Sequence, residues 1–138
     1  MNFPSTCKAI VLFDGVCNLC NAGVDFIIRR DSQGIFCFAS LQSDIGKQWL
    51  SHCNTTGEAV VLVVEGQCFT GSDAGLEVLR RLGRPWRWLY VLRYVPGKLR
   101  EALYRWIASH RYRWFGKRST CRIPSPQERK RFLDYQRD

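Results

Sequence analysis

Residues 9–20 read AIVLFDGVCNLC and combine an apolar run with a pair of cysteines. The first five residues are all apolar, which is typical of a strand covered on both faces that has lost the usual alternation. Apolar residues then recur at helical spacing from Cys17 to about Arg30, and the arginines at the end suit a helix C-terminus. The sequence therefore predicts a buried strand over 9–13 that leads directly into a helix beginning near Cys17.

Strands and helices continue to alternate up to residue 83. From apolar runs and helical spacing we predict strands over 35–39, 59–64 and 68–70, and helices over 45–50 and 72–82. Glu65-Gly66-Gln67 separates the last two strands, which predicts a β-hairpin. The order β-α-β-α-β-β-α indicates an α/β fold.

The remaining part of the chain is expected to be helical. Pro85 suits the first turn of a helix that ends before Pro96, and apolar residues over 99–110 trace an amphipathic helix. Residues 125–128 form a capping box with proline at the first helical position. That box predicts a last short helix, with the apolar residues Phe132, Leu133 and Tyr135.

The length of 138 residues suits one compact domain that buries its core without disulfide staples. No internal repeat or low-complexity linker divides the chain, so we expect a single domain over 1–138. Its α/β core is assigned to 1–83, and a basic helical C-terminal extension in 84–138 packs on it. The apolar runs are far below the ~18 to 20 residues of a membrane span, and no secretory signal pattern is recognised, so we expect a cytoplasmic protein.

Charge divides the chain into two unequal parts. Residues 1–79 hold four Lys/Arg against eight Asp/Glu, a net charge of −4, whereas residues 80–138 hold 17 against four, a net charge of +13. In the basic part, arginines alternate with Trp and Tyr. We expect the Trp and Leu side chains to pack the helices onto the sheet, and the arginines to form a solvated face whose stems cover apolar surface.

Two binding roles are also compatible with this basic, aromatic part. Basic amphipathic helices that carry Trp dock on anionic membrane surfaces, and the same surface suits an acidic protein. Nucleic-acid binding through phosphate contacts and base stacking is less favoured, because no recognised nucleic-acid motif is present. Peripheral contact with an anionic membrane or an acidic protein is therefore the favoured binding hypothesis.

The seven cysteines are an odd number without an export pattern, so we expect most of them to be reduced thiols. Four single cysteines are expected to be packing residues: Cys7, Cys37, Cys53 and Cys68. For Cys121, near the end of the chain, three roles stay open: a core thiol, a third redox partner or a metal ligand.

Cys17-Asn18-Leu19-Cys20 is the chemically distinctive motif, because it lies at a helix start directly after a buried strand. Two intervening residues in that position bring both sulfurs close enough to bridge. The helix N-terminus stabilises a thiolate on the first cysteine. We therefore expect Cys17 to border solvent and attack a substrate disulfide, and Cys20 to resolve the mixed disulfide by attacking Cys17.

Three other interpretations of this segment compete with disulfide exchange. Both thiols could simply pack in the core. A zinc site would need further ligands, for which Cys121, His52 and His110 are loosely available. A phosphohydrolase with a nucleophilic aspartate at the strand end usually has a second acid two residues on, where this chain has Val16.

Asp14 lies three residues before Cys17. The simpler interpretation is that it is a turn residue without a chemical role. The functional hypothesis is that its carboxylate takes a proton from Cys20 during resolution.

Asp14–Cys20 resembles the signature of the DCC family, thiol-disulfide oxidoreductases named for this Asp and the two cysteines. The similarity spans nearly the whole chain, through residues 71–74, 104–108, 111–116 and 121–124. It implies a thioredoxin-like mixed sheet and a redox-active Cys17–Cys20 pair that acts on a protein or small-molecule disulfide or dithiol. No cofactor or metal beyond the cysteines is expected. The alternative is a non-catalytic binding module, in which the basic helices contact the partner and the CxxC pair is vestigial or binds a metal.

Overall fold

The computed structural model describes residues 7–15, 17–31, 34–55, 60–82, 86–116 and 132. Along the chain these residues form β1 (Ala9–Phe13), α1 (Asn18–Arg30), β2 (Phe36–Ser40), α2 (Asp44–Cys53), β3 (Val60–Val64), β4 (Gln67–Thr70), α3 (Gly71–Arg81), the 3-10 helix η1 (Trp86–Tyr94) and α4 (Gly97–Phe115). The predicted order of strands and helices is confirmed. The helix expected after Pro85 is a 3-10 helix, and α4 extends five residues beyond the predicted end at 110.

The four strands form one mixed sheet in the order β2-β1-β3-β4. β1 pairs parallel with β2 and antiparallel with β3, and β3 forms the predicted hairpin with β4. β1 is therefore an inner strand, and all five of its residues are buried. This mixed α/β arrangement is consistent with a thioredoxin-like fold.

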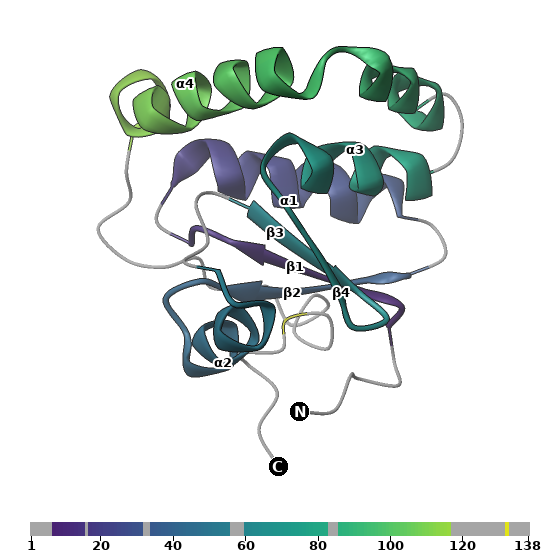
Figure 1. The fold of residues 1–138 in the computed structure, drawn as a ribbon. Coiled ribbons are helices and arrows are strands. Elements are labelled where there is room, and N and C mark those ends of the chain that lie inside the picture. Colours follow the sequence, from purple (N-terminus) through teal and green to yellow (C-terminus); the bar gives the residue numbers. More distant parts are fainter. Residues whose placement is uncertain are drawn as a thin grey trace.

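The sheet carries helices on both faces, which explains why β1 is apolar throughout. Val11 and Phe13 belong to the hydrophobic cluster under α1 and α3, whereas Ile10 and Leu12 pack with Trp49 of α2 on the opposite face. Figure 1 shows α1 and α3 above the sheet, α2 below it, and η1 with α4 as an outer layer over α1 and α3. No helix in the described part of the chain is long and apolar enough to cross a membrane.

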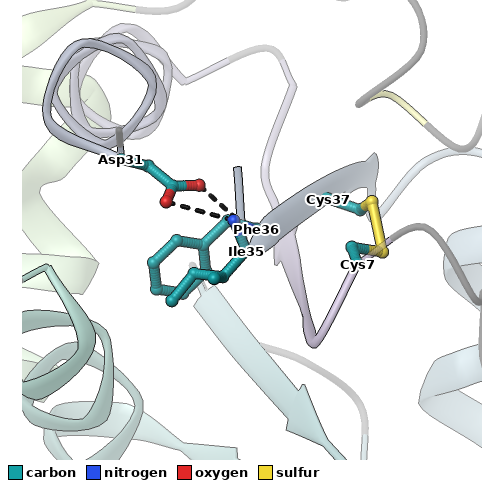
Figure 2. Close-up of a disulfide and its surroundings, with 5 residues drawn as sticks. All are labelled: Cys7, Asp31, Ile35, Phe36 and Cys37. Atoms are coloured by element: carbon teal, nitrogen blue, oxygen red, sulfur yellow. Dashed lines mark hydrogen bonds between the residues drawn. A yellow bond between two sulfur atoms is a disulfide. The ribbon is translucent and has the colours of Figure 1, made fainter. Parts of the chain in front are cut away.

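Asp31, the residue after α1, fixes the return of the chain into β2. Its buried carboxylate accepts hydrogen bonds from the backbone N–H groups of Ile35 (3.1 Å) and Phe36 (2.9 Å), as Figure 2 shows. A carboxylate that accepts two backbone donors satisfies groups that would otherwise be buried without partners. The end of α1 is therefore held against the start of β2.

Two disulfides correct the expectation that four single cysteines are reduced packing residues. Cys7 is bonded to Cys37 (Figure 2), and Cys53 is bonded to Cys68; the Cα atoms are 5.8 Å apart in each pair. Cys7 precedes β1 by two residues and Cys37 lies in β2, so the parallel pairing of these neighbouring strands brings the two segments close together, although Cys37 itself lies opposite Ile10. Spacing along the sequence does not reveal such pairs.

The basic part of the chain also differs from expectation. We predicted that Trp and Leu would pack inward and that arginines would be solvated, but Leu99 and Trp106 of α4 are 63% and 53% exposed. Arg100 and Arg111 instead point inward, to acidic residues of the α/β core. Trp86 does follow the prediction, since its ring packs edge-on against Phe26 of α1 at 4.9 Å between centroids.

Phe132 was expected on a last helix but forms an isolated parallel β-bridge with Phe38 on β2. It is buried, and its ring lies 5.4 Å from that of Phe38 between centroids. The capping box does not specify that this side chain completes the core beside β2. The rest of the predicted last helix, together with Cys121, lies outside the described residues.

Candidate functional site

The two cysteines of the CxxC motif lie at the N-terminus of α1, directly after β1. Cys17 is the N-cap residue of α1, and the backbone N–H of Cys20 donates to its Sγ at 3.4 Å. The N–H of Cys17 in turn donates to the carbonyl of Asp14 at 3.2 Å, which closes the turn after β1. Both cysteines carry thiols. An N–H donor at a helix N-terminus favours negative charge on the sulfur that it contacts.

Cys17 does not border solvent, as the sequence led us to expect, because it is 0% exposed. The C-terminal end of α4 lies across the start of α1: Asn18 donates to the carbonyls of Phe115, through its side chain at 2.8 Å, and of Gly116, through its backbone at 3.3 Å. Gly116 has a φ of 87°, and a Cβ there would lie 2.9 Å from Nδ2 of Asn18. The close approach of the two helix ends therefore requires glycine at this position.

Burial, with smaller contributions from the hydrogen bond and the charge of Cys17, raises the pKa of Cys20 from the ordinary value of 9.0 to about 12. A backbone hydrogen bond with Asp14 and the charge of Arg111 act in the opposite direction. Desolvation dominates because an apolar environment disfavours the thiolate. Cys20 is therefore a protonated thiol at neutral pH.

The carboxylate of Asp14 has more hydrogen-bond partners than a turn residue needs. Its buried carboxylate accepts hydrogen bonds from the side chain of Gln42 at 2.7 Å, from Nη2 of Arg111 at 3.0 Å and from the hydroxyl of Tyr112. Burial alone would lower the pKa of Arg111, but the hydrogen bonds with Asp14 and Tyr112 outweigh it and raise that pKa. The carboxylate thus joins the end of β1 to the C-terminal part of α4.

The side chains that bind Asp14 were not predicted from the sequence. Gln42 has no motif around it, so nothing in the sequence marks it. Arg111 and Tyr112 begin the segment 111–116 that resembles the DCC family. That resemblance was the only feature of the sequence that could have pointed to these two residues. Their proximity to Asp14 depends on how α4 lies on the core, which local patterns do not specify.

An apolar cavity of about 360 Å³ lies beside Cys20, enclosed by the sheet, α1, α3 and α4. Its walls are made mainly by apolar side chains, among them Val11, Phe13, Val24, Leu79 and Ile107. Polar groups come from Cys20, Tyr104 and Arg111. A cavity of this size with few polar groups in an apolar lining is typical of small-ligand sites.

Tyr104 and Arg111 are polar side chains of α4 in the lining of this cavity. Burial raises the pKa of Tyr104 to about 12, and the nearby charges of Cys20 and Glu101 contribute in the same direction. Nε of Arg111 is buried without a hydrogen-bond acceptor among the described residues. Both side chains therefore stay protonated at neutral pH.

Polar contacts also attach α4 at its other end. Glu101 accepts from the backbone N–H of Ser72 at 3.2 Å and from the Ser72 hydroxyl, and Arg100 pairs with Asp73. Thr70, the N-cap of α3, makes no side-chain capping bond, so the carboxylate of Glu101 takes that role from a different helix. α4 is thus held by polar contacts near both ends, and the cavity lies between them.

The described residues do not support the zinc hypothesis. No group of three or more His, Cys, Asp and Glu side chains is arranged to hold a metal among those residues. Cys121, the third thiol of that hypothesis, lies outside them.

Comparisons with known proteins agree on one family. The profile of the DCC1-like thiol-disulfide oxidoreductase family matches residues 11–117. The chain is 44% identical to "Uncharacterized protein YuxK" of Bacillus subtilis (strain 168), over 90% of this chain and 93% of that protein. It is 34% identical to "DCC family protein At1g52590, chloroplastic" of Arabidopsis thaliana, over 88% of this chain and 73% of that protein. No solved structure matches. The chain therefore belongs to the DCC1-like thiol-disulfide oxidoreductase family.

Proposed function

We propose that this protein exchanges thiols and disulfides through Cys17 and Cys20. The observation that carries the proposal is the position of the pair. Cys17 Sγ accepts the helix N-terminal N–H of Cys20, and Cys20 lies on the wall of an apolar cavity. Membership of the family supports a redox role, and the arrangement supports a different part for each sulfur.

In the first step, the Cys17 thiolate attacks one sulfur of a substrate disulfide. A mixed disulfide forms between Cys17 and that sulfur, and the other substrate sulfur leaves as a thiolate that takes a proton. In the second step, Cys20 loses its proton and attacks Sγ of Cys17, which releases the first substrate sulfur as a thiolate. The products are a Cys17–Cys20 disulfide and a substrate dithiol, so two electrons pass from protein to substrate. An external dithiol must then reduce the pair for turnover.

The high pKa of Cys20 fits the resolving role, because a thiol that stays protonated does not compete with Cys17 for the first attack. Its deprotonation then needs a base. We assign this role to Asp14. Its backbone contacts Cys20, and its carboxylate binds Arg111, whose charge also acts on Cys20. An Asp14→Asn variant whose disulfide exchange keeps the wild-type pH dependence would rule out this role.

The cavity supports a preference for substrates with an apolar group next to the disulfide. Such a group would enter the apolar space beside Cys20, whose lining also includes Tyr104 and Arg111. Because Cys17 is buried, the first attack also requires a movement that exposes its sulfur, and we place this movement at the contact between Asn18 and the C-terminal end of α4. We expect substrate binding to couple to that movement.

The test is reduction of insulin disulfides in the presence of dithiothreitol, together with the reduction potential of the Cys17–Cys20 pair. Wild type is expected to turn over and Cys17→Ser to be inactive. Cys20→Ser is expected to accumulate a mixed disulfide with the substrate on Cys17. Cys53→Ala/Cys68→Ala, which lacks one structural disulfide but keeps the CxxC pair, is the matched control and is expected to remain active.

The same samples separate the proposal from a non-catalytic binding module. Absence of a Cys17–Cys20 disulfide, absence of turnover and a stoichiometric zinc content would together favour the module. A mixed disulfide that accumulates on Cys20 in Cys17→Ser, and not on Cys17 in Cys20→Ser, would reverse the roles of the two cysteines.

A further inference from the structure

The large exposed apolar side chains of the described residues are all on η1 and α4. They number eleven and include Trp88, Tyr94, Leu99, Leu103, Trp106 and Trp114. We call the surface that these residues form the η1–α4 face. In Figure 1, η1 and α4 form the outer layer of the molecule, on the side away from α2. Such a concentration of apolar groups on one side of a soluble protein marks an interaction surface.

The contacts of α4 explain why its apolar side chains are left outward. Arg100, Tyr104, Ala108 and Arg111 recur at spacings of four, four and three residues, so they share the inner side of the helix. Both arginines form ion pairs with the core, and Ala108 is buried. Because polar contacts attach the helix, Leu99, Leu103 and Trp106 are not needed for packing onto the core and lie on a different side.

The charge of this segment favours an anionic partner. Residues 86–116 contain seven Lys/Arg against one acidic residue. Arg100 and Arg111 are neutralised by Asp73 and Asp14. Lys98, Arg105 and Arg113 of α4 are exposed and remain available to an external anion.

We propose that the η1–α4 face docks on an anionic lipid bilayer. Trp and Tyr side chains prefer the depth of the headgroups, Leu inserts into the acyl boundary, and Lys and Arg attract anionic lipids. An acidic protein or a nucleic acid would use the cations but would leave the leucines in water. A second copy of the chain placed face to face would bring the same positive charges together, which opposes symmetric association.

The docking proposal is independent of disulfide exchange, because it uses none of the cysteines. A Cys17→Ser variant is expected to bind membranes as wild type does. Failure of one proposal therefore leaves the other standing.

The experiment is co-sedimentation of the full chain with phosphatidylcholine vesicles, with and without phosphatidylglycerol. We expect binding to the anionic vesicles at low ionic strength, weaker binding as salt is added, and little binding to pure phosphatidylcholine. A second readout uses the Trp49→Phe variant. Its four remaining tryptophans all lie in η1 or α4: Trp86, Trp88, Trp106 and Trp114. Their fluorescence is expected to shift to the blue on binding and to be quenched by lipids with brominated chains.

Matched variants test each part of the surface. Lys98→Gln/Arg105→Gln is expected to weaken partitioning to anionic vesicles by about 30-fold, at the usual contribution of a basic residue near the surface. Leu103→Ser/Trp106→Ser is expected to weaken it by about tenfold, through loss of apolar insertion. Lys47→Gln changes an exposed lysine of α2, on the opposite side of the sheet, and is expected to bind as wild type does.

Several results would overturn the proposal. These are absence of binding to anionic vesicles at low ionic strength, equal binding to both kinds of vesicle, and the same loss in Lys47→Gln as in Lys98→Gln/Arg105→Gln. Self-association that Leu103→Ser/Trp106→Ser abolishes, without vesicle binding, would identify a second copy of the chain as the occupant instead.

Discussion

At the scale of single residues, the two buried cysteines of one motif have different surroundings. Cys17 caps α1 and accepts a backbone N–H, whereas Cys20 faces an apolar cavity that raises its pKa to about 12. The position of the motif at a helix start led us to expect different roles for the two, with Cys17 as nucleophile and Cys20 as resolving thiol. The sequence did not predict that Cys17 is buried. Its neighbour Asn18 contacts Phe115, about a hundred residues further along the chain, and local patterns do not specify such contacts.

The raised pKa of Cys20 predicts a shifted alkylation profile. In a Cys17→Ser/Cys121→Ser variant, the rate of reaction of Cys20 with iodoacetamide should still rise above pH 10, because the thiolate is scarce below its pKa of about 12. The same variant unfolded in urea should instead level off above the ordinary value of 9.0. A native profile that levels off there would contradict the burial argument.

The same pKa makes the stability of the fold depend on pH. Since the pKa of Cys20 is higher in the folded state, its contribution is complete below pH 9.0 and is lost as pH rises towards about 12. The free energy of unfolding should therefore fall over this alkaline range, and fall less steeply in Cys20→Ala. Parallel curves for the two proteins would show that Cys20 titrates alike in both states.

Asp14 and Arg111 predict a coupled loss of stability. Asp14→Asn leaves Arg111, whose side chain is 15% exposed, without its anionic partner. We expect the free energy of unfolding to drop by about 1 to 3 kcal/mol. Arg111→Met and the double variant complete the cycle, and the double variant should lose less than the sum of the single variants. Strictly additive losses would mean that the two groups do not interact.

At the scale of secondary-structure elements, sequence patterns predicted most of the sheet and its helices. β1, β3 and α3 were predictable because apolar runs and helical spacing report local burial. The orientation of α4 was not predictable from sequence patterns. It depends on the ion pairs of Arg100 with Asp73 and of Arg111 with Asp14, whose acidic partners are distant in the sequence. The disulfides were missed for the same reason: the partner of a cysteine depends on how distant segments pack, here α2 against β4 and the residues before β1 against β2.

The Cys53–Cys68 disulfide fastens the end of α2 to β4 and should stabilise the sheet edge. Its partners are 15 residues apart, so Cys53→Ala/Cys68→Ala should lose about 3 kcal/mol in the free energy of unfolding. Cys7→Ala/Cys37→Ala, with a separation of 30, should lose about 0.6 kcal/mol more if loop closure dominates. Urea unfolding without reductant measures both. Variants as stable as the oxidised wild type would show that these bridges add nothing.

At the scale of the whole molecule, α4 joins parts of the core that are far apart in sequence. Its first turns contact the N-terminus of α3 through Arg100 and Glu101, and its last turns contact Asp14 and Asn18. The cavity beside Cys20 exists because these contacts hold the helix across the space between α1 and α3. The basic extension is thus part of the candidate site, and its outer side is the proposed membrane surface.

This arrangement predicts that the α/β core and the α4 layer unfold together. In Trp49→Phe, every remaining tryptophan belongs to η1 or α4, so fluorescence reports on the outer layer while far-UV circular dichroism reports on all elements. Because the polar contacts of α4 bury charged groups against the core, detachment of α4 alone would expose an incomplete site and leave Asp14 without Arg111. The two urea transitions are therefore expected to coincide. A fluorescence transition at clearly lower urea would show that residues 86–116 separate from residues 7–82 as an independent unit.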